Sequence, residues 1–256
     1  MVPRADIRGK VLVTRSQPGA SDLADALHGA GYATLVCPVI DIRANEEPGL
    51  LTIVRRLDQF DVVIFVSGHA VRFGMDLIDR AWPSRPSPTW IAVGETTARK
   101  LARRGVTALT PAMETSEGIL ALPRLSSVVG QRVLICAGSE GRPLLSDELV
   151  RRGAVVERLE LYRRESVAAE HDAVRRIANE PIGAVVVASS DGARSFAKIW
   201  AAMGGDRRVA VVAPSQRVAA ELLGLGFQQV VVADGASAAA VIAALESVAG
   251  VADEDG

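Results

Sequence analysis

Short apolar runs alternate with amphipathic stretches along most of the chain. Runs such as Val62–Val66 and Ala184–Ala188 are typical of strands that are buried on both faces of a parallel sheet. Between such runs, apolar residues recur at helical spacing, as Leu23 and Leu27 do. The alternation predicts an α/β fold built on doubly wound parallel sheets.

The pattern predicts eight strands and eight helices. The expected strands are Lys10–Thr14, Ala33–Val36, Val62–Val66, Trp90–Val93, Val133–Cys136, Ala184–Ala188, Val209–Val212 and Gln229–Val232. The expected helices are residues 19–30, 69–79, 95–104, 116–122, 142–152, 191–202, 215–224 and 236–248. Two stretches break this order, residues 37–43 (CPVIDIR) and 155–163 (VVERLELYR), because each follows a strand with no helix between. Both alternate apolar and polar residues, so we expect extended linkers there.

The chain also repeats part of itself at a distance of 122 residues. The segment DVVIFVSGHAVRF (61–73) matches GAVVVASSDGARSF (183–196), which places Ser67 on Ser189. A distance one residue shorter places Leu109 on Val230. A repeat of this length is a domain rather than a solenoid unit. We therefore expect two similar domains, with a ligand in the cleft between them.

Composition and charge narrow the classes of function. Half of the residues (49%) are apolar, only 4% are aromatic, and the formal net charge is -1. A general nucleic-acid surface is therefore not expected. No apolar run reaches the roughly 20 residues of a membrane span, and the N-terminal MVPRADIRGK lacks a signal-peptide core, so we expect a cytoplasmic protein with no membrane partner. Cys37 and Cys136 lie in apolar runs and are expected to be buried and free.

Several familiar catalytic motifs are missing from the sequence. There is no P-loop, no G-x-G-x-x-G after the first strand and no G-x-S-x-G. The three histidines, His28, His69 and His171, have no spacing that suggests a metal site, so we expect no metal.

Small polar residues occur instead where strands end and helices begin, in both halves of the chain. The carboxyl ends of parallel strands form the ligand crevice of such folds, and helix N-termini there attract anions. An ordinary capping role is the alternative at each position. The candidates for substrate binding are Ser67, Gly68, His69, Thr96, Thr97, Ser116, Gly138, Ser189, Ser190, Gly192, Ser215 and Gln216.

Two arginines and one tyrosine complete the candidate site. Arg15 follows the first strand, and Arg142 is expected to open a helix after another strand, so both are placed to pair with carboxylates. Solvated or salt-bridged arginines are the alternative. Tyr162 lies in the second extended stretch, where a phenol either donates a proton or packs on a domain.

The order and spacing of seven segments resemble the uroporphyrinogen-III synthase family over residues 8 to 248. These segments are VLVTRS (11–16), DVVIFVSGHAV (61–71), VGETTARKLARRG (93–105), ETSEGIL (114–120), VLICAGSEGRPLLSDELVRRGA (133–154), LELYRRE (159–165) and GASAAAVIAAL (235–245). The resemblance implies two flavodoxin-like lobes with parallel sheets, joined by a two-stranded extended linker. It implies lobe one at 1–37 plus 164–256, lobe two at 42–158, and linkers at about 38–41 and 159–163.

The resemblance also implies a lyase activity of haem biosynthesis. The substrate would be hydroxymethylbilane, a linear tetrapyrrole with eight carboxylates, which closes to uroporphyrinogen III with loss of water, inversion of ring D and no cofactor. Tyr162 matches the family's tyrosine and would donate a proton to the leaving hydroxyl, while Thr97, Ser67 and Ser189 match its strand-end hydroxyl residues. Val218 departs from the pattern, because a hydroxyl often stands there. A monomer that receives substrate from hydroxymethylbilane synthase is expected.

Two other classes of protein stay open at this point. One is a non-catalytic two-lobed binding or sensor protein, which a missing signal peptide and output domain disfavour. The other is a nucleotide-sugar or phosphate-handling enzyme with two doubly wound domains, which the missing phosphate loop disfavours.

Overall fold

A computed structural model describes residues 7, 9–17, 19–168 and 170–252. Contacts divide the chain into unit 1, Met1–Asp41 with Glu165–Gly256, and unit 2, Ile42–Arg164. The implied lobe two began at residue 42 and ended at 158, so unit 2 continues six residues further along the second extended stretch. Most of the N-terminal stretch used to argue against a signal peptide lies outside the described residues.

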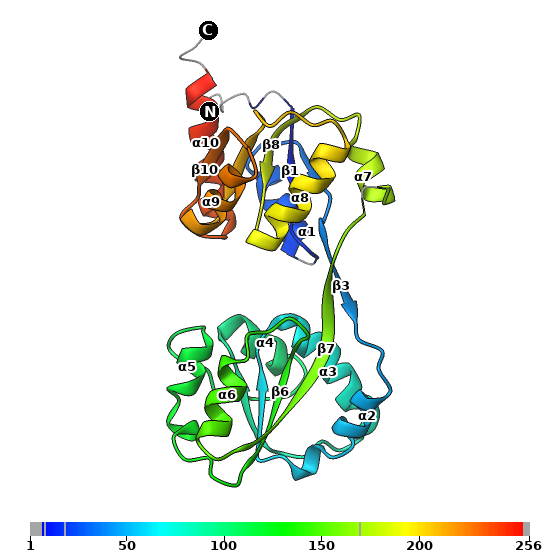
Figure 1. Ribbon diagram of the computed structural model, residues 1–256, viewed down its shortest axis with the longest axis vertical. Helices are drawn as coiled ribbons and strands as arrows, with labels where there is room; N and C mark the ends of the chain where they lie inside the picture. The colour runs from blue at the N-terminus through cyan, green and yellow to red at the C-terminus, as the bar shows by residue number, and fades with distance from the viewer. Residues whose placement is uncertain (1–6, 8, 18, 169, 253–256) are drawn as a thin grey trace. The chain divides into compact units, whose positions relative to one another are not determined.

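Unit 1 is a five-stranded parallel sheet with helices on both faces (Figure 1). The sheet order is β10-β9-β8-β1-β2, with β1 (Lys10–Val13), β2 (Thr34–Val36), β8 (Ile182–Val186), β9 (Ala210–Ala213) and β10 (Gln229–Val232). The helices are α1 (Gly19–Gly29), α7 (Asp172–Ile177), α8 (Ser190–Ala202), α9 (Gln216–Gly224) and α10 (Ala238–Ala252). Leu12 packs with α8 and α9, whereas its neighbour Val11 packs with α1 and α10. This alternation places a core on each face of the sheet.

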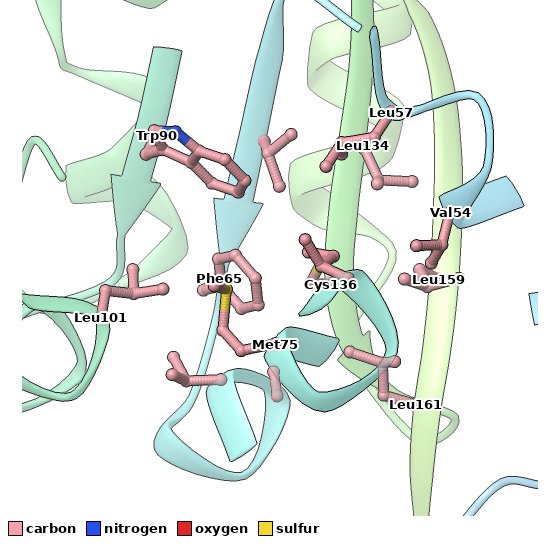
Figure 2. Close-up of a cluster of buried hydrophobic side chains, with 14 of the residues drawn as sticks. Val54, Leu57, Phe65, Met75, Trp90, Leu101, Leu134, Cys136, Leu159 and Leu161 are labelled. Carbon is pink, nitrogen blue, oxygen red and sulfur yellow. The ribbon is translucent and has the colours of Figure 1, made fainter. Parts of the chain in front are cut away.

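Unit 2 has the same layered design around the order β3-β7-β6-β4-β5. Its strands are β3 (Ile40–Ala44), β4 (Val62–Phe65), β5 (Thr89–Ala92), β6 (Arg132–Gly138) and β7 (Val155–Ser166). Its helices are α2 (Gly49–Val54), α3 (Gly68–Ala81), α4 (Glu95–Ala102), α5 (Ser116–Leu120), α6 (Leu144–Arg151) and the 3-10 turns η1 (Leu57–Gln59) and η2 (Pro123–Leu125). Figure 2 shows the core under α3, where Phe65, Met75 and Leu134 are fully buried.

Each unit combines strands from both copies of the sequence repeat. The segment β1-α1-β2 from the first copy joins β8, β9 and β10 of the second, and β6-α6-β7 from the second copy joins β4 and β5 of the first. Leu109 forms a single parallel bridge to Ile91, which is the position that β10 takes beside β9 in unit 1. The two copies have therefore exchanged their leading strand–helix–strand segments.

The predicted fold class, two α/β lobes with parallel sheets, is confirmed, while several local details differ. The stretch 155–163 is extended, as expected, and lies within β7, a 12-residue strand that lies between β3 and β6 in the sheet order. The stretch 37–43 likewise contributes β3, the neighbour of β7. The short helices α2 and α7 were not expected, since six residues give too few turns to show helical periodicity.

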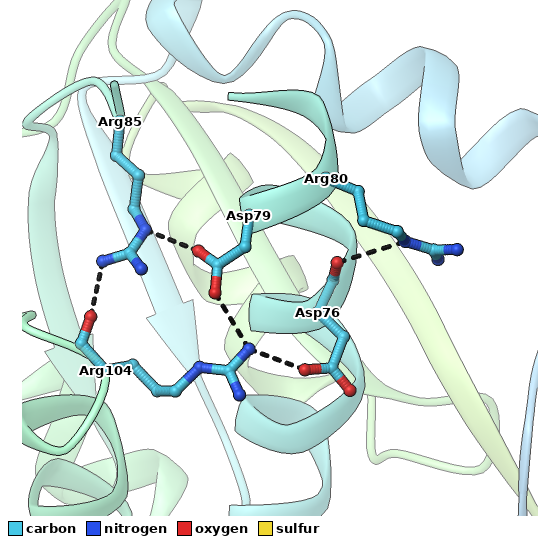
Figure 3. Close-up of polar contacts among 5 residues, drawn as sticks. All are labelled: Asp76, Asp79, Arg80, Arg85 and Arg104. Atoms are coloured by element: carbon cyan, nitrogen blue, oxygen red, sulfur yellow. Dashed lines mark hydrogen bonds and ion pairs between the residues drawn. The ribbon is translucent and has the colours of Figure 1, made fainter. Parts of the chain in front are cut away.

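A cluster of ion pairs fixes the proline-rich loop that follows α3 (Figure 3). Arg104 Nη2 lies 2.6 Å from Asp76 Oδ1 and 2.9 Å from Asp79 Oδ2. Arg85, from the loop, places its Nε 2.6 Å from the other Asp79 oxygen and donates to the carbonyl of Arg104. The loop therefore joins the C-terminal turn of α3 to the end of α4.

No helix in the described part of the chain is long and apolar enough to cross a membrane.

Candidate functional site

Tyr162 is turned toward the core of unit 2 by a β-bulge. The register of β6 against β7 shifts between Ala137 and Gly138, so that Gly138 pairs with Tyr162. In a regular strand, Leu161 and Tyr162 would point to opposite faces, but both contact the core under α3. The tyrosine is 4% exposed, and its ring lies 5.6 Å from that of His69 and 6.0 Å from that of Phe73. The ring of Tyr162 therefore packs on the core of unit 2, and the phenol oxygen at its end has a separate partner.

The phenol of Tyr162 is paired with the hydroxyl of Ser67. The two oxygens are 2.9 Å apart. Ser67 is the N-cap of α3, with extended backbone angles (φ -166°, ψ 160°), and its Oγ accepts the amide of Ala70 at 3.0 Å. Ser67 thus caps α3 just after the end of β4 and also forms a hydrogen bond with the phenol.

Gly138 provides the space in which the Tyr162 ring lies. A Cβ at this position would be 2.7 Å from Cε2 and 2.9 Å from Cζ of the ring, closer than such atoms approach. The amide of Ser139 donates to the carbonyl of Tyr162 at 2.9 Å and fixes the strand beside the bulge. Gly138 therefore acts through its lack of a side chain.

A pocket of about 280 Å³ opens at the carboxyl ends of β4 and β6. It is lined by Val66, Ser67, Ala137, Gly138, Ser139, Glu140, Gly141, Arg142, Tyr162 and Arg164. Arg142 was expected to open a helix, but α6 begins at Leu144 after the N-cap Pro143. Because proline at the cap sets the start of the helix, Arg142 stays in the loop as an exposed residue. The guanidinium groups of Arg142 and Arg164 thus line the same pocket as the hydroxyls of Ser67 and Tyr162.

His69 lies in electropositive surroundings in the first turn of α3. Burial lowers the pKa of its imidazole below the usual 6.5, and Lys100, Arg164 and Arg72 lower the pKa further. The ring is therefore neutral at pH 7. The first turn of α3 contains no acidic residue to offset these cations and the helix dipole.

The N-termini of α4 and α5 have internal hydrogen bonds of their own. The Glu114 carboxylate accepts the amide of Glu95 at 2.8 Å and covers Gly94, so the first turn of α4 already holds an anion. Thr97 is 5% exposed, whereas Thr96 faces solvent. At α5, the cap is Thr115, whose Oγ1 accepts the amide of Gly118 at 3.0 Å, and Ser116 is the first helical residue.

The equivalent edge of unit 1 carries the same caps with different partners. Ser189 caps α8 with φ -160° and ψ 165°, and its Oγ accepts the amide of Gly192 at 3.0 Å. Ser190 is 9% exposed, and its Oγ accepts Nη1 of Arg217 at 2.9 Å. Asp191 stands where unit 2 has His69, and it forms an ion pair with Arg194.

The remaining unit 1 candidates lie at neighbouring strand ends. Ser215 is the N-cap of α9 without a side-chain cap bond, and Gln216 is exposed. Val218, at the position where the expected hydroxyl is missing, is 1% exposed and packs in the core. Arg15 Nη1 donates to the carbonyl of Ala236 at 3.2 Å, and Arg15 lines a small hollow with Ala188 and Pro214. Arg15 is therefore placed at the carboxyl ends of the strands, as expected.

The described residues contain no group of three or more His, Cys, Asp or Glu side chains that would hold a metal ion. Cys37 and Cys136 are buried and free. Burial raises the pKa of the Cys37 thiol to about 11, and burial also raises that of Cys136. Neither thiol is a nucleophile at neutral pH.

Comparisons with known proteins decide the family. The family model described as uroporphyrinogen-III synthase HemD matches residues 8–243. The chain belongs to the uroporphyrinogen-III synthase family. A relative from Escherichia coli (strain K12), named uroporphyrinogen-III synthase, is 32% identical over 250 residues, which cover 92% of this chain and 99% of the relative. A relative of the same name from Salmonella typhimurium is 32% identical over 249 residues and covers 92% of this chain and 99% of the relative.

Solved structures of uroporphyrinogen-III synthases share the fold. A uroporphyrinogen-III synthetase from Helicobacter pylori 26695 aligns with a TM-score of 0.62 at 15% identity and covers 94% of this chain and 99% of that one. A mutant uroporphyrinogen III synthase from Thermus thermophilus aligns with a TM-score of 0.59 at 19% identity, over 94% of this chain and 98% of that one. At such identities these likenesses show the fold alone.

Three residues that contact the candidate positions were not predicted from the sequence. Thr115 was passed over for its neighbour Ser116, although a threonine three residues before Gly118 is an equally good capping signal. The Glu114 side chain lies against Gly94, and the Lys100 side chain lies against Gly68. Both pairs are distant in sequence, so no sequence pattern indicates either contact.

Proposed function

We propose that the chain closes hydroxymethylbilane to uroporphyrinogen III, with the Ser67–Tyr162 pair assisting the loss of the substrate hydroxyl. Membership in the family makes the chain a cyclising lyase of tetrapyrrole and haem biosynthesis. The observation that carries the assignment of residues is the 2.9 Å pair of hydroxyls beside a pocket at the strand ends.

The reaction needs a proton at the departing oxygen. When the C–O bond breaks, its electron pair leaves with the hydroxyl, which departs as water, and the adjacent pyrrole nitrogen supplies electrons to form an azafulvene cation. The ring D pyrrole attacks this cation and forms a spiro intermediate, which opens and recloses with ring D inverted. Loss of a proton at the end restores neutrality, so the net change is the release of one water.

The hydrogen bonds around Ser67 suit this proton donation. Ser67 Oγ accepts the amide of Ala70, and either hydroxyl of the pair can donate to the other. We propose the arrangement in which Ser67 donates its hydrogen to the oxygen of Tyr162. The phenolic hydrogen is then directed to a ligand in the pocket rather than back to the serine. Proton donation by a positioned side chain commonly contributes about 10²–10⁴-fold to a rate, and one well-placed phenol is enough for this step.

The protein must also bind the carboxylates of the substrate, which has eight. We assign this task to the strand-end residues Arg15, Arg142, Ser189, Ser190, Gly192, Ser215, Gln216, Ser67, Gly68, His69, Thr96, Thr97, Ser116 and Gly138. Amides at helix N-termini and bidentate guanidinium groups are natural partners for carboxylates. Because the Ser190 hydroxyl is buried, we expect Ser190 to act through its backbone amide. The buried Thr97, whose amide already donates to the carbonyl of Gly94 at 3.1 Å, supports the start of α4.

The instability of the substrate suggests how it reaches the chain. Hydroxymethylbilane closes spontaneously to the wrong isomer, so we propose a transient handover from hydroxymethylbilane synthase to a cytoplasmic monomer. Sedimentation of the chain alone and with that enzyme measures both points. A stable dimer of the chain would contradict the monomer.

The direct test is an assay with freshly made hydroxymethylbilane, followed by chromatographic separation of the product isomers. We expect isomer III to dominate when the chain is present and isomer I when it is absent. A product mixture dominated by isomer I in both cases would overturn the proposed function.

A further inference from the structure

Lys100 reaches from α4 across the N-terminus of α3. A Cβ on Gly68 would collide with Lys100 Nζ and would lie 3.0 Å from Cδ and 3.1 Å from Cε. The absence of a side chain at Gly68 therefore lets the ammonium lie over the first turn of α3. The ammonium thus lies over Gly68, the residue that follows Ser67 in the chain.

The Lys100 ammonium lies beside other positive charges, which repel it. The N-terminus of a helix carries a partial positive charge, and α3 has no acidic residue in its first turn. Arg72, Arg164 and Lys100 all act on His69 in the same turn. In the described part of the chain, no carboxylate forms an ion pair with Lys100, whereas Lys10 has Glu180 at 2.7 Å. Lys100 thus adds a positive charge to this turn, and none of the described carboxylates is paired with it.

The first-turn amides add hydrogen-bond donors at the same place. The amides of Gly68 and His69 come before the first intrahelical hydrogen bonds, and Ser67 Oγ is already used by the amide of Ala70. An ammonium beside two such amides suits a carboxylate, which accepts from several donors at once.

We propose that Lys100 binds a carboxylate of the tetrapyrrole together with the first-turn amides of α3. The inference rests on the proposed function and adds a binding residue to it. Lys100 acts on the bound substrate and takes no part in the proton transfer. Its removal therefore weakens binding and leaves the chemical step intact.

The test compares Lys100→Met and Lys100→Arg with Lys198→Met, which removes an exposed lysine of α8. Initial rates over a range of hydroxymethylbilane concentrations give KM and kcat. We expect Lys100→Met to raise KM about tenfold, the equivalent of one lost charged contact, with kcat within about twofold. Lys100→Arg and Lys198→Met should keep the KM of the parent. An unchanged KM in Lys100→Met, or an equal fall of kcat, would overturn the proposal.

A second measurement checks the location of the ammonium without any turnover. NMR titration follows the three histidines, of which His28 and His171 are exposed references. In Lys100→Met the pKa of His69 should move up toward 6.5, because one of the cations that lower it is gone. No movement of the His69 pKa would show that Lys100 does not lie beside this turn and would overturn the proposal even if the variant were less active.

Failure of this inference is distinguishable from failure of the proposed function. If the parent chain makes no isomer III, the function itself is wrong. If the parent makes isomer III and Lys100→Met does so with the same KM, only the role of Lys100 is wrong.

Discussion

Units 1 and 2 begin their equivalent helices α8 and α3 in the same way and then differ in what surrounds the cap. Ser189 and Ser67 adopt nearly the same backbone angles and accept an amide at 3.0 Å each. Two residues later, unit 1 has Asp191 paired with Arg194, whereas unit 2 has His69 among cations. Of the two serines, Ser67 is the one that holds a phenol. The shared cap is thus a property of the fold, and the difference around it is what supports the proposal that proton donation takes place in unit 2.

The largest expected effect comes from Gly138→Ala. The added Cβ would displace the Tyr162 ring, which lies 2.7 Å from it, and would fill part of the pocket. Misplacing the phenol costs at most what its removal costs, and the lost pocket volume adds to this, so we expect a loss of kcat on the order of 10²-fold. Gly224→Ala is the matched control, because a Cβ at the end of α9 meets no atom within 4 Å. Equal turnover of the two variants would contradict the placement of the phenol.

Replacing each capping serine by alanine separates the cap from the chemistry. Both Ser67→Ala and Ser189→Ala should lower the free energy of unfolding by about 1 kcal/mol, the usual contribution of a helix cap. Only Ser67→Ala should also slow kcat, by roughly tenfold, since it removes the partner of Tyr162. Chemical denaturation and steady-state rates measure the two effects. A similar loss of kcat in Ser189→Ala would remove the distinction between the units.

A smaller effect is expected from making unit 1 more like unit 2 at one position. Gly192 occupies the place that Ala70 has in α3, and Ser189 Oγ lies 3.2 Å from a Cβ built there. Because Ala70 fits beside Ser67 in the same geometry, Gly192→Ala should fit as well. We expect a gain in the free energy of unfolding of up to about 1 kcal/mol from helix propensity. A loss of stability would show that the two caps are less alike than their angles indicate.

The smallest effect is the pH dependence that His69 gives to unit 2 alone. Its pKa is lowered in the folded protein by burial and then by Lys100, Arg164 and Arg72. Below pH 6.5 the unfolded chain therefore takes up a proton that the folded chain does not, and stability falls as the pH decreases toward the folded pKa. His69→Gln should lose less stability than the parent over this range. His28→Gln, at an exposed histidine of α1, is the control and should follow the parent curve.

Much of the fold was predictable because both units are built from strongly patterned elements. The apolar run of residues 62–66 and the helix after it follow from periodicity alone, and β4 and α3 lie there. The exchange of strand–helix–strand segments between the units came only from the family resemblance. Short helices such as α7 have too few residues for a periodic signal.

In the candidate site, the sequence predicted only those contacts that join residues close together in the chain. Ser67 and Ser189 were found because a serine between a strand and a helix is a capping signal. The bulge that turns Tyr162 was missed, because strict alternation places this residue and Leu161 on opposite faces. Glu114 over Gly94 was missed because that contact depends on tertiary packing.

The most direct test of the account is a double-mutant cycle on the turnover of Tyr162→Phe and Ser67→Ala. We predict that Tyr162→Phe slows kcat by about ten- to thirtyfold and that adding Ser67→Ala slows it little further, because the two hydroxyls act as one unit. Combining Tyr162→Phe with Ser189→Ala should give effects that simply multiply. A kcat of Tyr162→Phe equal to that of the parent, or independent effects of Ser67 and Tyr162, would contradict the claim that this pair of unit 2 assists the loss of the hydroxyl.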